Sequence, residues 1–144
     1  MSAIANFIGG LAGATAVTLV NESVRQFMPQ APQLQLYGIR AVRQIFNKTD
    51  ADMPDREEQY GMAMGGELMA NASYYSMAGR STTKGVLLGL AAGLGGIFLP
   101  DKLDLGKAPS NQTLTTQIMT VGYYVLGGIV AAKTTRALSG KRRK

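Results

Sequence analysis

Residues 85–93 read GVLLGLAAG, with a glycine at every fourth position and only apolar side chains between them. A spacing of four places Gly85, Gly89 and Gly93 on one face of an α-helix. In water, each glycine would destabilise the helix by roughly 1 kcal/mol relative to alanine. In lipid, a row of small residues lets two helix backbones approach closely and pack by van der Waals contact. The stretch therefore predicts a transmembrane helix with a packing face.

The same spacing of small residues recurs in three other segments, which are Ala5-Gly9-Gly13, Gly61-Gly65 with Gly66-Ala70, and Gly128-Ala132. This repetition predicts an all-α integral membrane bundle of about four transmembrane helices. The length of 144 residues suits a single membrane domain over the whole of residues 1–144. The candidate helix-packing residues are Gly9, Gly13, Gly61, Gly65, Gly85, Gly89, Gly93 and Gly128.

Charge is distributed unevenly along the chain. Lysine and arginine exceed aspartate and glutamate by 15 to 9, a formal net charge of +6, yet residues 1–21, 85–100 and 108–132 carry no charge. A soluble helical protein would interleave charges at helical period through every segment. The long uncharged stretches therefore favour a lipid environment.

The predicted spans cover residues 3–24, 55–78, 83–99 and 113–137. The second has a clear beginning, with Asp52 as a helix cap and Pro54 in the first turn, and Gly79 is suited to its end. The third is short: at about 1.5 Å per residue it reaches only some 25 Å, less than the ~30 Å hydrocarbon core. Local thinning of the bilayer and a re-entrant path both remain open for it.

Residues 36–46 form an amphipathic segment in the first loop. The apolar residues recur at steps of three and four, whereas Arg40 and Arg43 lie elsewhere around the helix. A helix of this kind lies in the headgroup plane with its apolar side down, or it caps one end of the bundle.

The basic tail, residues 139–144, follows the last span directly. Its charges predict contact with anionic lipid headgroups and a cytoplasmic location, through Lys141, Arg142, Arg143 and Lys144. An even number of spans then places both termini in the cytoplasm of a multi-pass cell-membrane protein. The chain contains no recognition motif for nucleic acid, so nucleic acid is not a predicted partner.

The chain has no cysteine and no histidine. This composition excludes thiolate zinc sites, cysteine nucleophiles, imidazole bases and histidine-ligated haem. It predicts no metal and no cofactor, and it argues against an enzyme. Any catalysis would be limited to carboxylate or arginine chemistry on a lipid headgroup.

Glu67 lies midway along the second predicted span. A carboxylate at that depth is costly and marks a possible functional site. Polar residues extend from it along one helix face, and the fourth span carries a second polar stripe. The candidate polar-interior residues are Glu67, Asn71, Tyr74, Gln117, Thr120 and Tyr124. These side chains either hydrogen-bond between helices or line a polar interior.

Glu22 and Arg25 are three residues apart near the end of the first span. The spacing predicts an ion pair between them. The alternative is that Arg25 reaches Glu67 or a lipid phosphate.

Two functional hypotheses follow. The first is a non-enzymatic structural or accessory membrane protein that packs through glycine-rich helix faces with itself or with another membrane protein. The alternative is a small transporter or channel with a polar bundle interior around Glu67.

Overall fold

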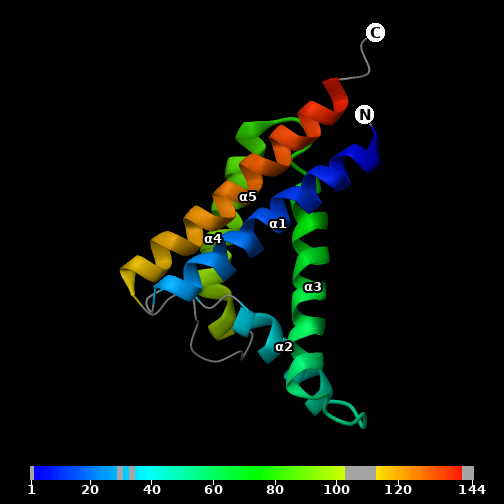
Figure 1. Ribbon diagram of the computed structural model, residues 1–144, viewed down its shortest axis with the longest axis vertical. Helices are drawn as coiled ribbons and strands as arrows, with labels where there is room; N and C mark the ends of the chain where they lie inside the picture. The colour runs from blue at the N-terminus through cyan, green and yellow to red at the C-terminus, as the bar shows by residue number, and fades with distance from the viewer. Residues whose placement is uncertain (1, 29–30, 33–34, 103–112, 141–144) are drawn as a thin grey trace.

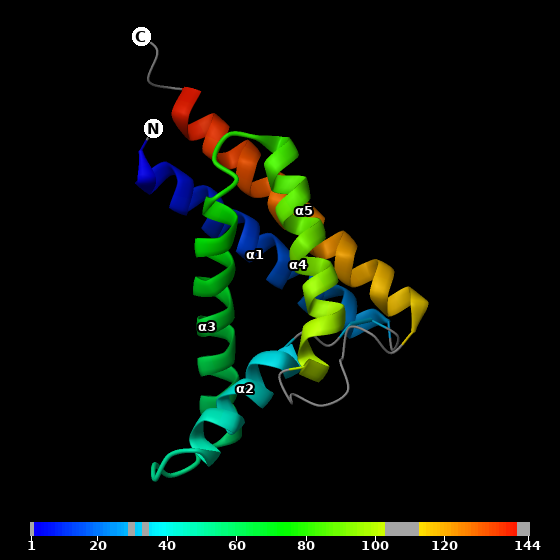
Figure 2. The same cartoon turned by 180° about the vertical axis from the view of Figure 1, so that it is seen from behind.

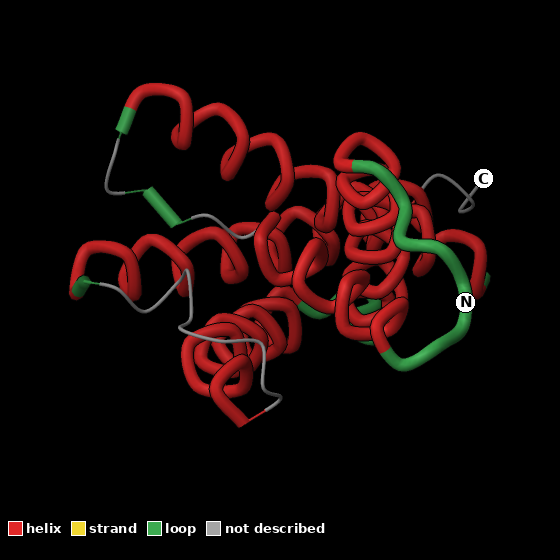
Figure 3. Tube along the Cα trace, turned by 90° about the horizontal axis from the view of Figure 1, so that it is seen from below, coloured by secondary structure: helices red, strands yellow, loops and turns green. Residues whose placement is uncertain are grey.

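The computed structural model describes residues 2–28, 31–32, 35–102 and 113–140. Within these residues the fold is all-α, as the sequence predicted, and Figure 3 shows helices joined by loops. The helices are α1 (Ala3–Phe27), α2 (Gln35–Asn47), α3 (Arg56–Ser76), α4 (Thr82–Lys102) and α5 (Leu114–Gly140) (Figure 1).

The helix α5 packs against both α4 and α1, and α1 packs in turn against α3. The contacts of α3 with α4 and α5 are sparse, so α3 lies at the margin of the bundle. The short helix α2 packs against α3. Both termini and the turn between α3 and α4 lie at one end of the molecule (Figure 1). The helix α2 lies at the opposite end (Figures 1 and 2).

Three helices are long and apolar enough to cross a membrane: α1, residues Thr82–Leu99 of α4, and α5. They correspond to the first, third and fourth predicted spans. The second predicted span is present as the helix α3, but α3 is less apolar than the other three and is not among the candidate membrane spans. Its sequence contains Arg56, Glu57, Glu58 and Glu67 besides several amides and hydroxyls. Length and composition therefore support three spans and not four.

The third predicted span, residues 83–99, agrees with the apolar part of α4, Thr82–Leu99, but the helix itself is longer. Pro100 was expected to begin a loop, but α4 continues to Lys102 and contains 21 residues. At about 1.5 Å per residue, the whole helix is about 32 Å long, but its apolar part, Thr82–Leu99, contains 18 residues and is about 27 Å long. The apolar span therefore remains slightly shorter than a hydrocarbon core of ~30 Å, as the sequence predicted.

The beginning of α3 lies three residues after the predicted cap. Asp55, not Asp52, is the N-cap, and its side chain accepts a hydrogen bond from the Glu58 backbone N–H (2.9 Å). The Glu58 carboxylate accepts one from the Asp55 N–H (3.1 Å), which completes a capping box. At the other end, Gly79 adopts a φ of 55°, a left-handed conformation that suits glycine in the turn to α4.

The buried core is small. It joins Val17 of α1, Tyr75 of α3, and Tyr123, Tyr124 and Ala131 of α5. The Tyr75 hydroxyl donates to the backbone carbonyl of Tyr124 over 2.7 Å, which links α3 to α5 across this core.

Large apolar side chains cover much of the outer surface. Leu19 of α1 is 61% exposed, Leu87 of α4 is 59% exposed and Ile118 of α5 is 63% exposed. An apolar exterior of this extent on three neighbouring helices is typical of a surface that contacts lipid or another protein.

Candidate functional site

The backbones of α4 and α5 approach each other closely at a row of glycines. A Cβ atom built on Gly128 would lie 1.9 Å from the Gly85 carbonyl oxygen, and one on Gly85 would lie 2.2 Å from the Gly128 oxygen. A Cβ on Gly89 would meet the Tyr124 oxygen at 2.5 Å. Because these neighbours are backbone atoms, no side-chain rotation could make room. Gly93 continues the row against Val121.

Adjacent glycine pairs on α1 and α5 each contact two neighbouring helices. Gly9 faces Thr135 of α5, whereas Gly10 faces the Ala72 carbonyl of α3, 2.0 Å from a built Cβ. In the same way, Gly127 faces Val17 of α1 and Gly128 faces α4.

Gly10, Gly13 and Gly127 all lie against a neighbouring helix, but only Gly13 was predicted to do so. The predicted residue Gly13 lies against the Gly127 carbonyl. Gly10 and Gly127 were not among the predicted residues, although the Gly-Gly doublets at 9–10 and 127–128 were a signal for them.

The glycines of α3 differ from all of these. Gly61, Gly65 and Gly66 have no atom within 4 Å of a built Cβ among the described residues. All three are exposed on the outer side of the bundle. Two of them, Gly61 and Gly65, are predicted packing residues, and the described part of the chain supplies no helix against them.

The predicted polar residues are divided between different helix pairs. Glu67 is half-buried on α3, where its charge interacts with that of Glu22 on α1. The Tyr74 hydroxyl donates to the Leu88 carbonyl of α4 over 2.8 Å. Asn71 is half-buried between them along α3.

The polar residues of α5 face α4. The buried Thr120 hydroxyl donates to the Thr116 carbonyl on its own helix (2.8 Å), and both Thr120 and Tyr124 lie near Gly96 of α4. Gln117 is half-buried one turn away. The six candidates thus lie at several interfaces, and none of them lines the hollow beside Ile4 and Leu138, the hollow between α2 and α3, or the hollow along Ile8–Leu19 of α1.

A polar cluster lies where the end of α1 meets the beginning of α3. Arg25 and Glu22 form the predicted ion pair. The charge of Glu22 also acts on Tyr60 of α3. Asn21 Oδ1, Glu22 Oε1 and Arg25 Nε are buried and have no hydrogen-bond partner among the described residues. Unsatisfied buried polar atoms are costly, so their concentration here is a functional signal.

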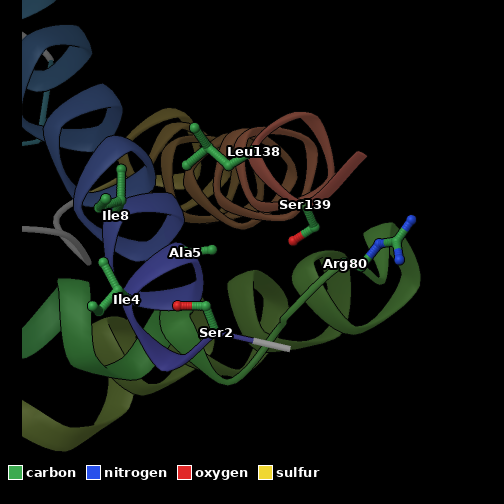
Figure 4. A pocket seen from close by; sticks show the side chains of 7 residues that line it. All are labelled: Ser2, Ile4, Ala5, Ile8, Arg80, Leu138 and Ser139. Carbon is green, nitrogen blue, oxygen red and sulfur yellow. The ribbon is translucent and has the colours of Figure 1, made fainter. Parts of the chain in front are cut away.

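One surface hollow lies at the end of the molecule that carries the termini. Its volume is about 550 Å³. Figure 4 shows Ile4, Ala5 and Ile8 of α1 opposite Leu138 and Ser139 of α5, with Arg80 at the edge. The lining is largely aliphatic, and it brings together no pair of groups suited to acid–base or nucleophilic chemistry.

A second hollow, between α2 and α3, contains charged groups that the sequence did not single out. It has a volume of about 410 Å³, and its lining includes Arg40, Arg43 and Arg56. Arg40 and Arg43 belong to the polar side of the amphipathic segment, which was the available signal. The contribution of Arg56 depends on how α3 packs against α2.

Among the described residues, no group of three or more acidic, cysteine or histidine side chains could hold a metal ion. Comparison of the chain with protein-family models, curated proteins and solved structures finds no match. The function is therefore argued from the chain's own residues.

Proposed function

We propose that this chain is a small multi-pass membrane protein with a structural or accessory role, which associates through the glycine face of α3. The observation that carries the proposal is the contrast between two sets of glycines. Most glycines of α1, α4 and α5 lie against other helices, although Gly122 and Gly140 of α5 are open, whereas Gly61, Gly65 and Gly66 of α3 all have nothing within 4 Å. In lipid, such a face allows a second helix to approach closely.

The membrane location has two supports. Three helices have the length and apolarity of membrane spans. The same helices expose large aliphatic side chains such as Leu87 and Ile118, which would be unfavourable in water and are favourable against acyl chains.

We further propose that α3 crosses the membrane as a fourth span. A short turn at residues 77–81 joins it to α4, so that both helices extend from the same end of the molecule. Its carboxylate residue, Glu67, is half-buried and lies near enough to α1 for its charge to interact with that of Glu22. A partner helix on the glycine face would cover the opposite side.

The basic tail has its four charged residues at positions 141–144, which lie outside the described residues. We propose that it contacts anionic headgroups and that both termini are cytoplasmic. Its four basic residues directly follow α5, an arrangement that favours the cytoplasmic side.

The association is tested with the variants Gly65→Leu and Gly61→Leu in lipid nanodiscs or vesicles. Energy transfer between labelled copies measures self-association, and co-purification measures binding of other membrane proteins. Both variants should fold normally, because space is open at these positions, and both should lose association. Gly122→Leu, at an open position on α5, is the matched control and should change neither property. A native chain that neither self-associates nor retains a membrane partner would contradict the role.

A second candidate function, a proton-coupled transporter or channel, is favoured by the polar cluster of Asn21, Glu22, Arg25 and Tyr60, whose Glu22 also interacts with the charge of Glu67. The unsatisfied buried atoms of Asn21, Glu22 and Arg25 provide positions for a proton or a solute. In reconstituted vesicles, Glu67→Gln should then abolish a pH-dependent flux that the native chain supports. If Glu67 only holds helices together, the native chain should show no such flux.

A further inference from the structure

The groove between α2 and α3 has a mixed lining. Three arginine side chains border it, Arg40 and Arg43 from α2 and Arg56 from the first turn of α3. Leu36 and Ile39 form an apolar wall from α2, and Tyr60 adds an aromatic ring from α3. None of the described residues that line the groove is acidic.

Gln59 fixes one of these arginines in place. Its side chain is only 6% exposed, and its Oε1 accepts a hydrogen bond from Arg43 Nε over 2.7 Å. Its Nε2 donates to the Pro54 carbonyl, also over 2.7 Å. Both ends of the amide are therefore engaged, and Arg43 is held at the groove. A guanidinium has five N–H donors, and this bond uses one of them.

The electrostatics of the groove favour an anion. Arg43 and Arg56 place two guanidinium charges at one hollow, and like charges repel one another unless negative charge lies between them. Arg56 begins α3, whose amino-terminal end is already capped by Asp55 in the capping box with Glu58. Glu57 and Glu58 on the same turn are exposed and do not line the hollow. Guanidinium groups bind phosphate oxygens in pairs, which makes phosphate a well-matched anion.

We propose that this groove binds the phosphate of an anionic phospholipid, with an acyl chain along Leu36 and Ile39. The apolar wall favours a lipid over a free phosphate ion, because an ion would leave it in contact with water. The helix α2 lies at one end of the bundle, where headgroups would lie if the helices cross a bilayer (Figure 2). The choice of a membrane lipid as the ligand therefore rests on the proposed membrane location.

The test uses the full chain purified in uncharged detergent and titrated with short-chain phosphatidic acid, short-chain phosphatidylcholine or inorganic phosphate. Phosphatidic acid should bind at least tenfold more tightly than either of the others. Arg43→Gln and Arg56→Gln should each weaken its binding by about fivefold, the effect expected of one basic residue at a lipid surface. Arg43→Lys should restore part of the affinity, since it keeps the charge but loses the planar fork.

Lys48→Gln is the matched control, because Lys48 is a basic residue of the same region that does not line the groove. It should leave the affinity for phosphatidic acid unchanged. Equal binding of both lipids, equal binding of inorganic phosphate, or full affinity in both arginine variants would each overturn the proposal. The membrane location is tested separately by alkaline extraction of vesicles that contain the chain. Release of the chain would contradict the proposed function even if the detergent titration succeeded.

Discussion

At the scale of single residues, stability in this bundle depends on where side chains are missing. The doublets Gly9-Gly10 and Gly127-Gly128 each remove two adjacent side chains, so that one helix can contact two neighbours through its backbone. Close backbone approach is a main source of helix association in lipid, where apolar burial contributes little. A single methyl group at such a position should therefore matter more than it does at an ordinary core site.

Gly128→Ala tests this expectation. The new Cβ would lie 1.9 Å from the Gly85 oxygen, so α4 and α5 must separate. We expect a loss of about 3 kcal/mol or more in unfolding free energy, at the upper end of overpacking effects. Gly122→Ala on the same helix meets open space and should be neutral or stabilising by up to about 1 kcal/mol. Reversible unfolding in mixed detergent micelles measures both, and equal stability of the two variants would contradict the contact.

A substitution of Arg136 tests a polar contact between α5 and the turn that joins α3 to α4. Its guanidinium donates to the Arg80 carbonyl at 2.9 and 3.3 Å and to the Thr82 hydroxyl at 3.3 Å, which ties α5 to the turn between α3 and α4. Because Arg136 is exposed, we expect Arg136→Gln to cost only about 1 kcal/mol. Amide exchange at residues 78–82 should accelerate. Lys133→Gln, at an exposed position of the same helix, is the control and should leave the rate of amide exchange at residues 78–82 unchanged.

At the scale of helices, hydropathy and helix-end signals predicted α1, α2 and α5 closely, because their patterns are local. The prediction of Asp52 as the cap of α3 was wrong. Asp50, Asp52 and Asp55 are all suitable cap residues, and only Asp55 forms the capping box with Glu58. Pro100 did not end α4, although proline often ends a helix.

Glycine spacing marked which residues are small but not which helix lies opposite them. Gly9 and Gly65 therefore looked alike in the sequence, yet one is in contact and the other is open. Tyr75, the central buried tyrosine, was missed because its role depends on the distant carbonyl of Tyr124.

The attachment of α2 to α3 gives a prediction at this scale. A Cβ on Gly38 would lie 2.7 Å from the Ala63 Cβ, so Gly38→Val should push α2 away from α3 at a cost of about 1–3 kcal/mol. Amide exchange in α2 should accelerate by about tenfold or more, while exchange in α1, α4 and α5 stays unchanged. Asn47→Ala, at an exposed position of α2, serves as the control. Unchanged protection of α2 in Gly38→Val would show that this contact does not hold the helix.

At the scale of the whole molecule, the number of crossings decides where the ends of the chain lie. The amino terminus, the α3–α4 turn and the carboxyl terminus share one end of the bundle (Figure 1), and the bond from Arg136 to Arg80 connects α5 to that turn. In this arrangement, the proposed crossing of α3 returns the chain to the side where it began. With only α1, α4 and α5 crossing, the turn and the carboxyl terminus would lie on the side of α2, opposite the amino terminus.

Single-cysteine labelling separates these topologies, and the chain contains no cysteine of its own. Ser2→Cys, Ser81→Cys, Ser139→Cys and Thr49→Cys are each treated with an impermeant thiol reagent in sealed, uniformly oriented vesicles, before and after permeabilisation. We expect positions 2, 81 and 139 to label on one side and position 49 on the other, because α3 returns the chain to the side where it began. If positions 81 and 139 label together with 49, α3 does not cross. Its glycine face would then lie outside the hydrocarbon core, where it cannot contribute to association within the membrane.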